Sequence, residues 1–439
     1  MHTKDSRVDD AGRAADWLCL QLGSREHYAI PRVLAKQERL AGLLTDTWIP
    51  RWVAPAVRRF HPSLGQRRHD GISDQHVRAA TCGRLVQDVR YRLRRLDPWD
   101  SILARNDWFQ AWTVRQLATW RQAADASVCF SYSYTARLPF REAKRRGMQC
   151  VLGQIDPGPL ESVVVAESTA DYAGWALPGA AEPPARYWDA WREEVELADL
   201  ILVNSSWSAD LLARAGVSLN KIAEVPLAHE GGQRAARPRR CLPATGRASA
   251  DSTRRTTSGE EERRPRMDGR DMVVLFLGQV ILRKGVGQLF EAVRLLEGHP
   301  IRFVFAGPLG VQVPAWIRSN PQVEFTGPVD REEAARLYRS SDVFVLPTLS
   351  DGFALTQLEA QAHGLPVIAS SSCGRVVNDG VNGLILAEVT PQAIAEALRR
   401  LAQEPELLER LQRNSRMDEA FSLNALGHKL SKIESRLKR

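Results

Sequence analysis

Two carboxylates, Asp351 and Glu359, lie eight residues apart in the segment PTLSDGFALTQLEAQAHGLPVIASSSCG, which covers residues 347–374. The apolar runs DVFVL before them and PVIA after them have the length and composition of short strands. We predict a helix between these strands that begins near Gly352 or Phe353, with Asp351 at or beside its N-cap. At a rise of about 1.5 Å per residue, eight helical positions separate the two carboxylates by about 12 Å.

This predicted helix start could bind a long, polar, anionic ligand. Its unpaired backbone N–H groups and positive dipole end would attract phosphates, whereas the carboxylates can only accept hydrogen bonds from hydroxyl groups. A diphosphate with a sugar at each end, as in a nucleotide sugar, meets these requirements. For an isolated acidic pair, an ordinary cap and a solvated helix residue would be the simpler interpretation.

A second segment favours the ligand site. Residues 272–277, MVVLFL, form a predicted strand that ends at Gly278, and Arg283-Lys284-Gly285 stand where an amphipathic helix begins. Glycine lets the backbone approach a ligand closely. Cations at a helix start oppose the helix dipole, so their presence there implies a bound anion.

These residues resemble glycosyltransferase family 4, a large family of retaining enzymes. Its C-terminal signature contains Gly-Arg, Lys-Gly, two glutamates eight positions apart with Ala after the second, and Gly-Leu-Pro-Val. The corresponding residues here are Gly278-Gln279, Lys284-Gly285, Asp351, Glu359-Ala360 and Gly364-Leu365-Pro366-Val367. The runs ADLILVNS, residues 198–205, and VPL, residues 225–227, extend the resemblance into the first half of the chain.

The resemblance implies roles for these residues. Lys284 would hold the donor diphosphate, Glu359 the ribose hydroxyls and Asp351 the transferred sugar, while backbone N–H groups of Gly352, Phe353 and Ala354 would cover the phosphates. The sequence departs from the signature twice, because Gln279 replaces an arginine that binds phosphate and Asp351 replaces a glutamate. Arg283 could return the missing positive charge, although glutamine makes a weaker contact with phosphate than arginine does.

The family has the GT-B fold, an α/β architecture in which two Rossmann-like doubly wound domains face a central cleft. We therefore expect a chain of four parts, which fits its 439 residues. They are an acceptor-binding domain over residues 1–229, an Arg-rich flexible linker over 230–271, a domain for the nucleotide sugar over 272–417, and a helix over 418–439 that crosses back to the first domain.

The expected linker differs in composition from the rest of the chain. It has almost no bulky apolar residues and is rich in Arg, Gly, Ser, Thr and Pro. Its eleven arginines and seven acidic residues give a net charge of +4, half of the chain's +8. The basic charge therefore says little about the folded domains, and we expect no nucleic-acid partner.

Acceptor binding is expected in the first half of the chain. The loop after the predicted strand at residues 16–22 supplies Gly23, Arg25 and His27 as candidates. The family often has a histidine after a later strand, where it lines the donor site near the transferred sugar, and here Asp156 or Gln154 could take this catalytic position. The stretches 48–60 and 90–96 mix aromatic and cationic residues. They could contact an anionic membrane carrying a lipid-linked acceptor or stack on sugars, or they could be an aromatic core with a solvated cationic face.

These observations predict a cytoplasmic hexosyltransferase that moves a sugar from a nucleotide diphosphate donor to a glycan or glycolipid hydroxyl, with retention implied by the resemblance. No Asp-x-Asp occurs in the sequence, so we expect neither a metal nor another cofactor. No apolar run is long enough to span a membrane, the first residues are too charged for a secretory signal, and the six cysteines lack paired spacing. A catalytically weakened sugar-nucleotide or glycan scaffold and a sugar-nucleotide epimerase are the alternatives.

Overall fold

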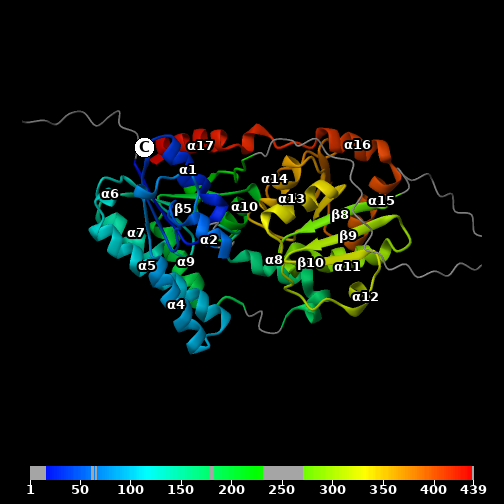
Figure 1. The fold of residues 1–439 in the computed structure, drawn as a ribbon, viewed down its shortest axis with the longest axis horizontal. Helices are drawn as coiled ribbons and strands as arrows, with labels where there is room; N and C mark the ends of the chain where they lie inside the picture. Colours follow the sequence, from blue (N-terminus) through cyan, green and yellow to red (C-terminus); the bar gives the residue numbers. More distant parts are fainter. Residues whose placement is uncertain (1–15, 61–63, 65–66, 178–181, 231–269, 438–439) are drawn as a thin grey trace, which may run out of the picture. The chain divides into compact units, whose positions relative to one another are not determined.

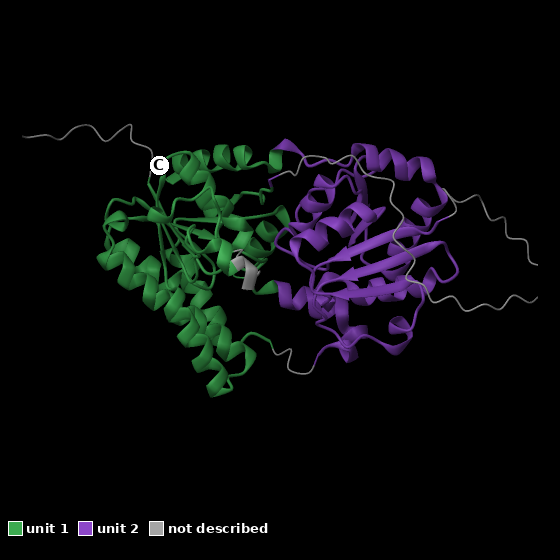
Figure 2. Cartoon of the chain, viewed as in Figure 1, with its two compact units in different colours: residues 1–160, 181–229, 420–439 green, residues 161–180, 230–419 purple. Residues whose placement is uncertain are grey.

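The computed structural model describes residues 16–60, 64, 67–177, 182–230 and 270–437. The chain divides into two compact units, which Figure 2 colours separately. Unit 1 comprises residues 1–160, 181–229 and 420–439, and unit 2 comprises residues 161–180 and 230–419. Residues 231–269, nearly all of the expected linker, lie outside the described residues.

Unit 1 is built on a seven-stranded parallel sheet in the order β3-β2-β1-β4-β5-β6-β7 (Figure 1). Its inner strands are nearly continuous apolar runs, as a sheet covered on both faces requires. The strands are β1 Trp17–Gln21, β2 Leu40–Thr45, β3 Val77–Ala79, β4 Val128–Tyr132, β5 Gln149–Gly153, β6 Leu200–Val203 and β7 Ile222–Glu224.

Helices cover both faces of this sheet. Helices α1 and α17 pack on one face, and α7, α9 and α10 pack on the other. At the far end of the chain α17 is tied to β1, because Trp17 Nε1 donates to Glu434 Oε1 at 2.6 Å and Arg39 forms an ion pair with the same carboxylate. The helices are α1 Ala29–Lys36, α2 Ala54–Phe60, α4 Thr81–Arg94, α5 Pro98–Thr119, α6 Arg121–Ala124, α7 Arg137–Arg145, α9 Ala185–Leu197, α10 Ser206–Arg214 and α17 Leu423–Leu437.

Unit 2 is built on a six-stranded parallel sheet in the order β10-β9-β8-β11-β12-β13. Helices α11, α12, α15 and α16 pack on one face, and α13 and α14 on the other. The strands are β8 Met272–Leu277, β9 Ile301–Ala306, β10 Val323–Gly327, β11 Val343–Leu346, β12 Val367–Ser370 and β13 Gly383–Leu386. The helices are α11 Val286–Leu295, α12 Ala315–Arg318, α13 Arg331–Ser340, α14 Thr356–Ala362, α15 Pro391–Gln403 and α16 Pro405–Asn414.

A short segment from the first half of the sequence is built into unit 2. It contains most of α8, Leu160–Thr169, and the 3₁₀ helix Ala170–Trp175. Gln288 Nε2 donates to the carbonyl oxygen of Ser168 at 2.8 Å, and the Trp175 ring lies 6.1 Å from that of Phe290. Residues 1–229, which we expected to form one domain, therefore divide between the two units.

The prediction of two doubly wound Rossmann-like domains is confirmed. In both sheets the chain starts in the middle, moves outward in one direction and then crosses to the other side, so each sheet has a point where the strand order reverses. The five cysteines in the described part of the chain are free thiols. Among the described helices, none has both the length and the apolar character needed to cross a lipid bilayer.

Candidate functional site

The strand order of unit 2 reverses between β8 and β11, where a doubly wound sheet usually binds its ligand. Glycines bring the loops that follow the strands into contact at this edge. A Cβ atom on Gly285 would lie 1.8 Å from the carbonyl oxygen of Pro347, just after β11. A Cβ on Gly307, after β9, would lie 1.9 Å from the carbonyl oxygen of Gly278, just after β8. Side chains at these two glycines would therefore force the loops apart.

The structure brings together two of the predicted site residues at this edge. Lys284, just before α11, forms an ion pair with Asp351, and both side chains are largely buried, at 15% and 14% exposed. Burial, and then the neighbouring guanidinium of Arg283, lower the pKa of Lys284 to about 7. Glu161 acts in the opposite direction, because a carboxylate stabilises the protonated amine.

Arg283 lies beside this pair and is held by two other groups. Its Nη1 donates to the carbonyl oxygen of Ser350 at 2.8 Å and lies 3.3 Å from Oε1 of Glu161. The Ser350 hydroxyl donates to the same Glu161 oxygen at 2.9 Å. Both cations of the site are thus paired with carboxylates of the chain itself.

Sequence reasoning missed Glu161, which stands in the first turn of α8. It lies more than 120 positions from Arg283 in the sequence, so no local spacing connects the two. The only available signal was the Pro157-Gly158-Pro159 run, which predicts a turn just before the residue.

The predicted helix start at Gly352 or Phe353 is wrong, because α14 begins at Thr356. Asp351 is therefore not its N-cap; its backbone N–H donates to the carbonyl oxygen of Ser372, and its side chain pairs with Lys284. Gly352, Phe353 and Ala354 lie in the loop before the helix, and Ala354 has a left-handed φ of 64°. The helical separation of about 12 Å between the carboxylates does not apply, because only part of the stretch is helical.

Glu359 and Gln279 are not part of the ion pair. Glu359, on α14, accepts a hydrogen bond from the Tyr338 hydroxyl at 2.9 Å, and within the described part of the chain it forms no ion pair with Lys284. The Gln279 side chain is exposed. Beside it, Gly278 has a φ of 149° and open space where a Cβ would stand, which leaves its backbone accessible to a ligand.

Unit 1 has a comparable edge, where its strand order reverses between β1 and β4. Gly23, with a φ of 85°, donates its N–H to Asp46 Oδ1 at 2.8 Å. His27 and its two neighbours, Glu26 and Tyr28, form a left-handed turn, with φ between 51° and 60°. This conformation costs about 1–2 kcal/mol for each residue with a Cβ, and such strain is typical of functional loops.

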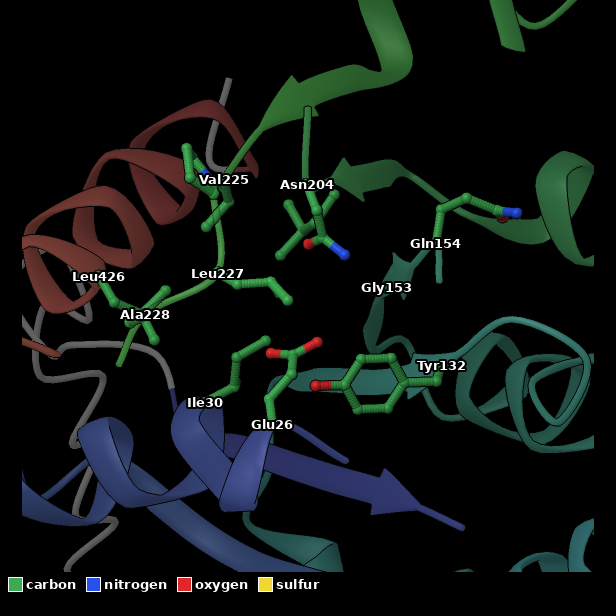
Figure 3. A pocket seen from close by; sticks show the side chains of 12 residues that line it. Glu26, Ile30, Tyr132, Gly153, Gln154, Asn204, Val225, Leu227, Ala228 and Leu426 are labelled. Atoms are coloured by element: carbon green, nitrogen blue, oxygen red, sulfur yellow. The ribbon is translucent and has the colours of Figure 1, made fainter. Parts of the chain in front are cut away.

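Arg25 and two cavities lie at the same edge. The guanidinium of Arg25 lies 5.9 Å from the ring centre of Tyr132, and both residues line a cavity of about 120 Å³. In a smaller cavity of about 10 Å³, the Glu26 carboxyl and the Tyr132 hydroxyl point toward each other (Figure 3). Burial raises the pKa of Glu26 to about 7, so this carboxyl is partly protonated at neutral pH.

Asp156 and Gln154 follow β5 and hold each other in place. Asp156 Oδ1 accepts hydrogen bonds from the Tyr134 hydroxyl at 2.7 Å, from Gln154 Nε2 at 3.0 Å and from the N–H of Gly158 at 3.0 Å. Gln154 Oε1 accepts from Trp191 Nε1 at 3.0 Å. These contacts are all internal to unit 1.

Two doubly wound units in one chain match the architecture of the GT-B fold. Two solved structures share this fold over nearly their whole length. Sucrose-phosphate synthase from Thermosynechococcus elongatus has a TM-score of 0.66 at 17% identity, and the alignment covers 97% of this chain and 99% of that one. Anabaena HepE in complex with UDP-glucose has a TM-score of 0.58 at 12% identity, with coverage of 96% and 100%.

The sequence comparisons match the second half of the chain. Residues 258–418 match the family described as Glycosyl transferases group 1. A D-inositol 3-phosphate glycosyltransferase of Streptomyces griseus is 34% identical over 158 residues, which are 32% of this chain and 34% of the relative. The corresponding Streptomyces avermitilis protein is 30% identical over 237 residues, which are 50% and 47%. The matches thus span between a third and a half of these relatives.

Proposed function

We propose that this protein is a glycosyltransferase that moves a hexosyl unit from a nucleotide diphosphate sugar to a hydroxyl group of a glycan or a lipid-linked glycan, with retention at the anomeric carbon. The observation that carries this proposal is the placement of Lys284 and Arg283 between the β8 and β11 loops, at the reversal point of the sheet. The match of residues 258–418 to the family Glycosyl transferases group 1 supports it.

In this proposal Lys284 and the N-terminus of α11 bind the donor diphosphate. Lys284 would exchange its contact with Asp351 for one with phosphate, which frees the Asp351 carboxylate to accept a hydrogen bond from the transferred sugar. Gly278 provides open backbone near the phosphates, and Glu359 accepts from the ribose hydroxyls. Gln279, Gly285 and the loop Gly352-Phe353-Ala354 complete the proposed donor site.

The chemistry replaces one bond at the anomeric carbon with another. The bond from this carbon to the diphosphate oxygen breaks, the acceptor oxygen forms the new glycosidic bond, and the acceptor proton passes to the departing diphosphate. Negative charge grows on the diphosphate as it leaves, so Lys284 and Arg283 would stabilise the transition state more than the ground state. Asp156 of unit 1 is a proposed catalytic residue near the transferred sugar, and Gly23, Arg25 and His27 are the proposed acceptor residues.

A panel of UDP- and GDP-sugars tests the proposal, and UDP-glucose, the ligand of HepE, is the first donor to try. Release of free nucleotide that requires an acceptor would support transfer. We expect Lys284→Ala and Glu359→Ala each to weaken nucleotide binding at least tenfold by titration calorimetry, because each removes a contact with charged or hydroxyl groups. Circular dichroism should show that both variants remain folded. Unchanged affinity in both variants would remove the site assignment.

The second candidate is a scaffold that binds a sugar nucleotide without turnover. It is favoured by Gln279 in place of an arginine and by the pairing of both Lys284 and Arg283 with internal carboxylates. Nucleotide binding without release of product on any acceptor would support the scaffold. Isomerisation of the donor without acceptor would instead indicate an epimerase.

A further inference from the structure

Helix α4 of unit 1 is amphipathic, but its apolar side faces solvent and its polar side faces the protein, the reverse of an ordinary surface helix. Its apolar side chains face outward: Leu85, Val86, Val89 and Leu93 are 58%, 52%, 55% and 78% exposed. At 3.6 residues per turn, these four fall within about 100° of the helix circumference. They therefore form one continuous apolar stripe.

The polar side of α4 packs on the protein. Asp88 forms ion pairs with Arg84 at 3.1 Å and with Arg105 of α5 at 3.3 Å. The Tyr91 hydroxyl donates to the carbonyl oxygen of Ala104, also on α5, at 2.9 Å. These contacts fix the rotation of α4 about its axis, so the apolar stripe cannot turn inward without breaking them.

Arginines surround the stripe. On the helix wheel, Arg92 lies just beyond one edge of the stripe and Arg90 just beyond the other, and Arg94 and Arg95 follow at the C-terminal end. Among the described residues, none of these four forms an ion pair with a carboxylate. An apolar stripe with cations along its edges is the pattern of a helix that lies in the surface of an anionic membrane.

We propose that α4 binds the surface of an anionic lipid bilayer, with Leu85, Val86, Val89 and Leu93 inserted among the acyl chains and the arginines against the headgroups. A second copy of the chain is a poorer occupant, because a two-fold interface would bring the same arginines of both copies together. The inference does not depend on the proposed transferase reaction, since lipid binding requires no turnover.

The location of α4 indicates a role for its membrane-binding surface. Ile102 and Asn106 of the adjoining helix α5 line the 120 Å³ cavity together with Arg25 and Tyr132. A membrane-bound α4 would therefore hold this cavity near the bilayer, where the polar head of a lipid-linked molecule could reach it. Figure 1 shows α4 and α5 together in unit 1.

Co-sedimentation of the full chain with vesicles tests the proposal. We expect binding to mixed phosphatidylglycerol and phosphatidylcholine vesicles, weaker binding at high salt, and little binding to phosphatidylcholine alone. Leu93→Asp should abolish binding. The double variant Arg90→Gln/Arg92→Gln should lower the partition onto anionic vesicles roughly 30-fold, because each arginine near such a surface contributes about a fivefold factor.

Two controls match these variants elsewhere in unit 1. Leu219→Asp changes another exposed leucine, 68% exposed, and Arg121→Gln another exposed arginine, and both should bind like the wild type. Circular dichroism would establish that each variant is folded. Equal vesicle binding by the wild type and the folded Leu93→Asp variant would overturn the proposal. The proposal would also be overturned if light scattering showed that the chain is a dimer without lipid and that Leu93→Asp converts it to a monomer. The apolar stripe would then join two copies of the chain.

Discussion

At the scale of single residues, the candidate donor site holds its cations against internal carboxylates. Lys284 is paired with Asp351 and Arg283 with Glu161, so each cation of the site already has a carboxylate partner. A diphosphate must therefore replace at least one carboxylate when it binds. Glu161 is the more readily replaced, because its 3.3 Å contact is long for an ion pair and its partner Arg283 is 30% exposed, twice the exposure of Lys284.

We predict that Glu161→Gln strengthens UDP binding roughly fivefold, about 1 kcal/mol, because the variant removes a competing charge from a partly exposed ion pair. The amide can still accept the hydrogen bond from Ser350, so the local structure should persist. Titration calorimetry gives the affinity. This prediction depends on the proposed function, since it assumes that Arg283 contacts the diphosphate.

A double-mutant cycle separates this effect from others. If Glu161 acts through Arg283, then Glu161→Gln should change UDP affinity little in an Arg283→Gln background. Glu167→Gln, at an exposed position of the same helix, is the matched control and should leave binding unchanged. UDP binding that is equal or weaker in Glu161→Gln would contradict the counter-ion role. If neither the wild type nor the variants bind any nucleotide, the proposed function itself fails.

At the scale of elements, strand-end glycines hold the loops of the site in contact. Gly285 and Gly298 both have left-handed backbones, with φ of 71° and 80°, but a Cβ on Gly285 would overlap Pro347, whereas nothing lies within 4 Å of a Cβ on Gly298. We predict that Gly298→Ala costs about 1 kcal/mol from backbone strain alone. Gly285→Ala should cost more than about 3 kcal/mol, because the Pro347 backbone must also move.

Urea unfolding of the two variants measures this difference, and UDP titration of the same samples provides a second readout. Gly285→Ala should also lose nucleotide affinity, because it moves Lys284 relative to Asp351, while Gly298→Ala should keep it. Equal stability losses in the two variants would mean that the loop after β11 adapts to the new methyl group. The contact between the loops would then be unimportant for the site.

The sequence predicted the regular elements of unit 2 better than its loops. Met272–Leu277 is a strand as expected, and Asp330 caps α13 by accepting the N–H of Glu333 at 2.9 Å. These features depend on local patterns of apolar and capping residues. The start of α14 was misplaced because a capping aspartate and an ion-paired aspartate look alike in sequence, and the partner, Lys284, is 67 positions away.

Unit 1 was harder to predict from local patterns. Helix α4 has apolar residues at helical spacing, which normally indicates a core-facing stripe, yet that face is exposed. Only the packing of Asp88 and Tyr91 on α5 determines which side faces outward. Likewise, no spacing indicates that residues 161–180 belong to unit 2, because Ser168 contacts Gln288 and Trp175 contacts Phe290, both more than 100 positions away.

At the scale of the whole molecule, sequence order and structural units do not coincide. Residues 420–439 follow unit 2 in the sequence, but α17 belongs to unit 1, where Leu426, Leu430 and Ile433 join the side chains of α1 and the sheet. The last helix, α17, should therefore stabilise unit 1, most of which is far from α17 in the sequence. Each unit has hydrophobic clusters of its own, so stability losses in one should stay largely within it.

Two fully buried leucines test this division. Leu430→Ala, in α17, and Leu411→Ala, in α16, each remove a leucine side chain with no exposed surface, which should cost about 2–5 kcal/mol. Hydrogen exchange measured by mass spectrometry locates the loss. We expect Leu430→Ala to reduce protection in β1, β4 and α1 while β8 and β11 keep theirs, and Leu411→Ala to do the reverse. If either variant lowers protection equally in both sheets, the chain unfolds as one cooperative body, and α17 stabilises the whole molecule rather than unit 1.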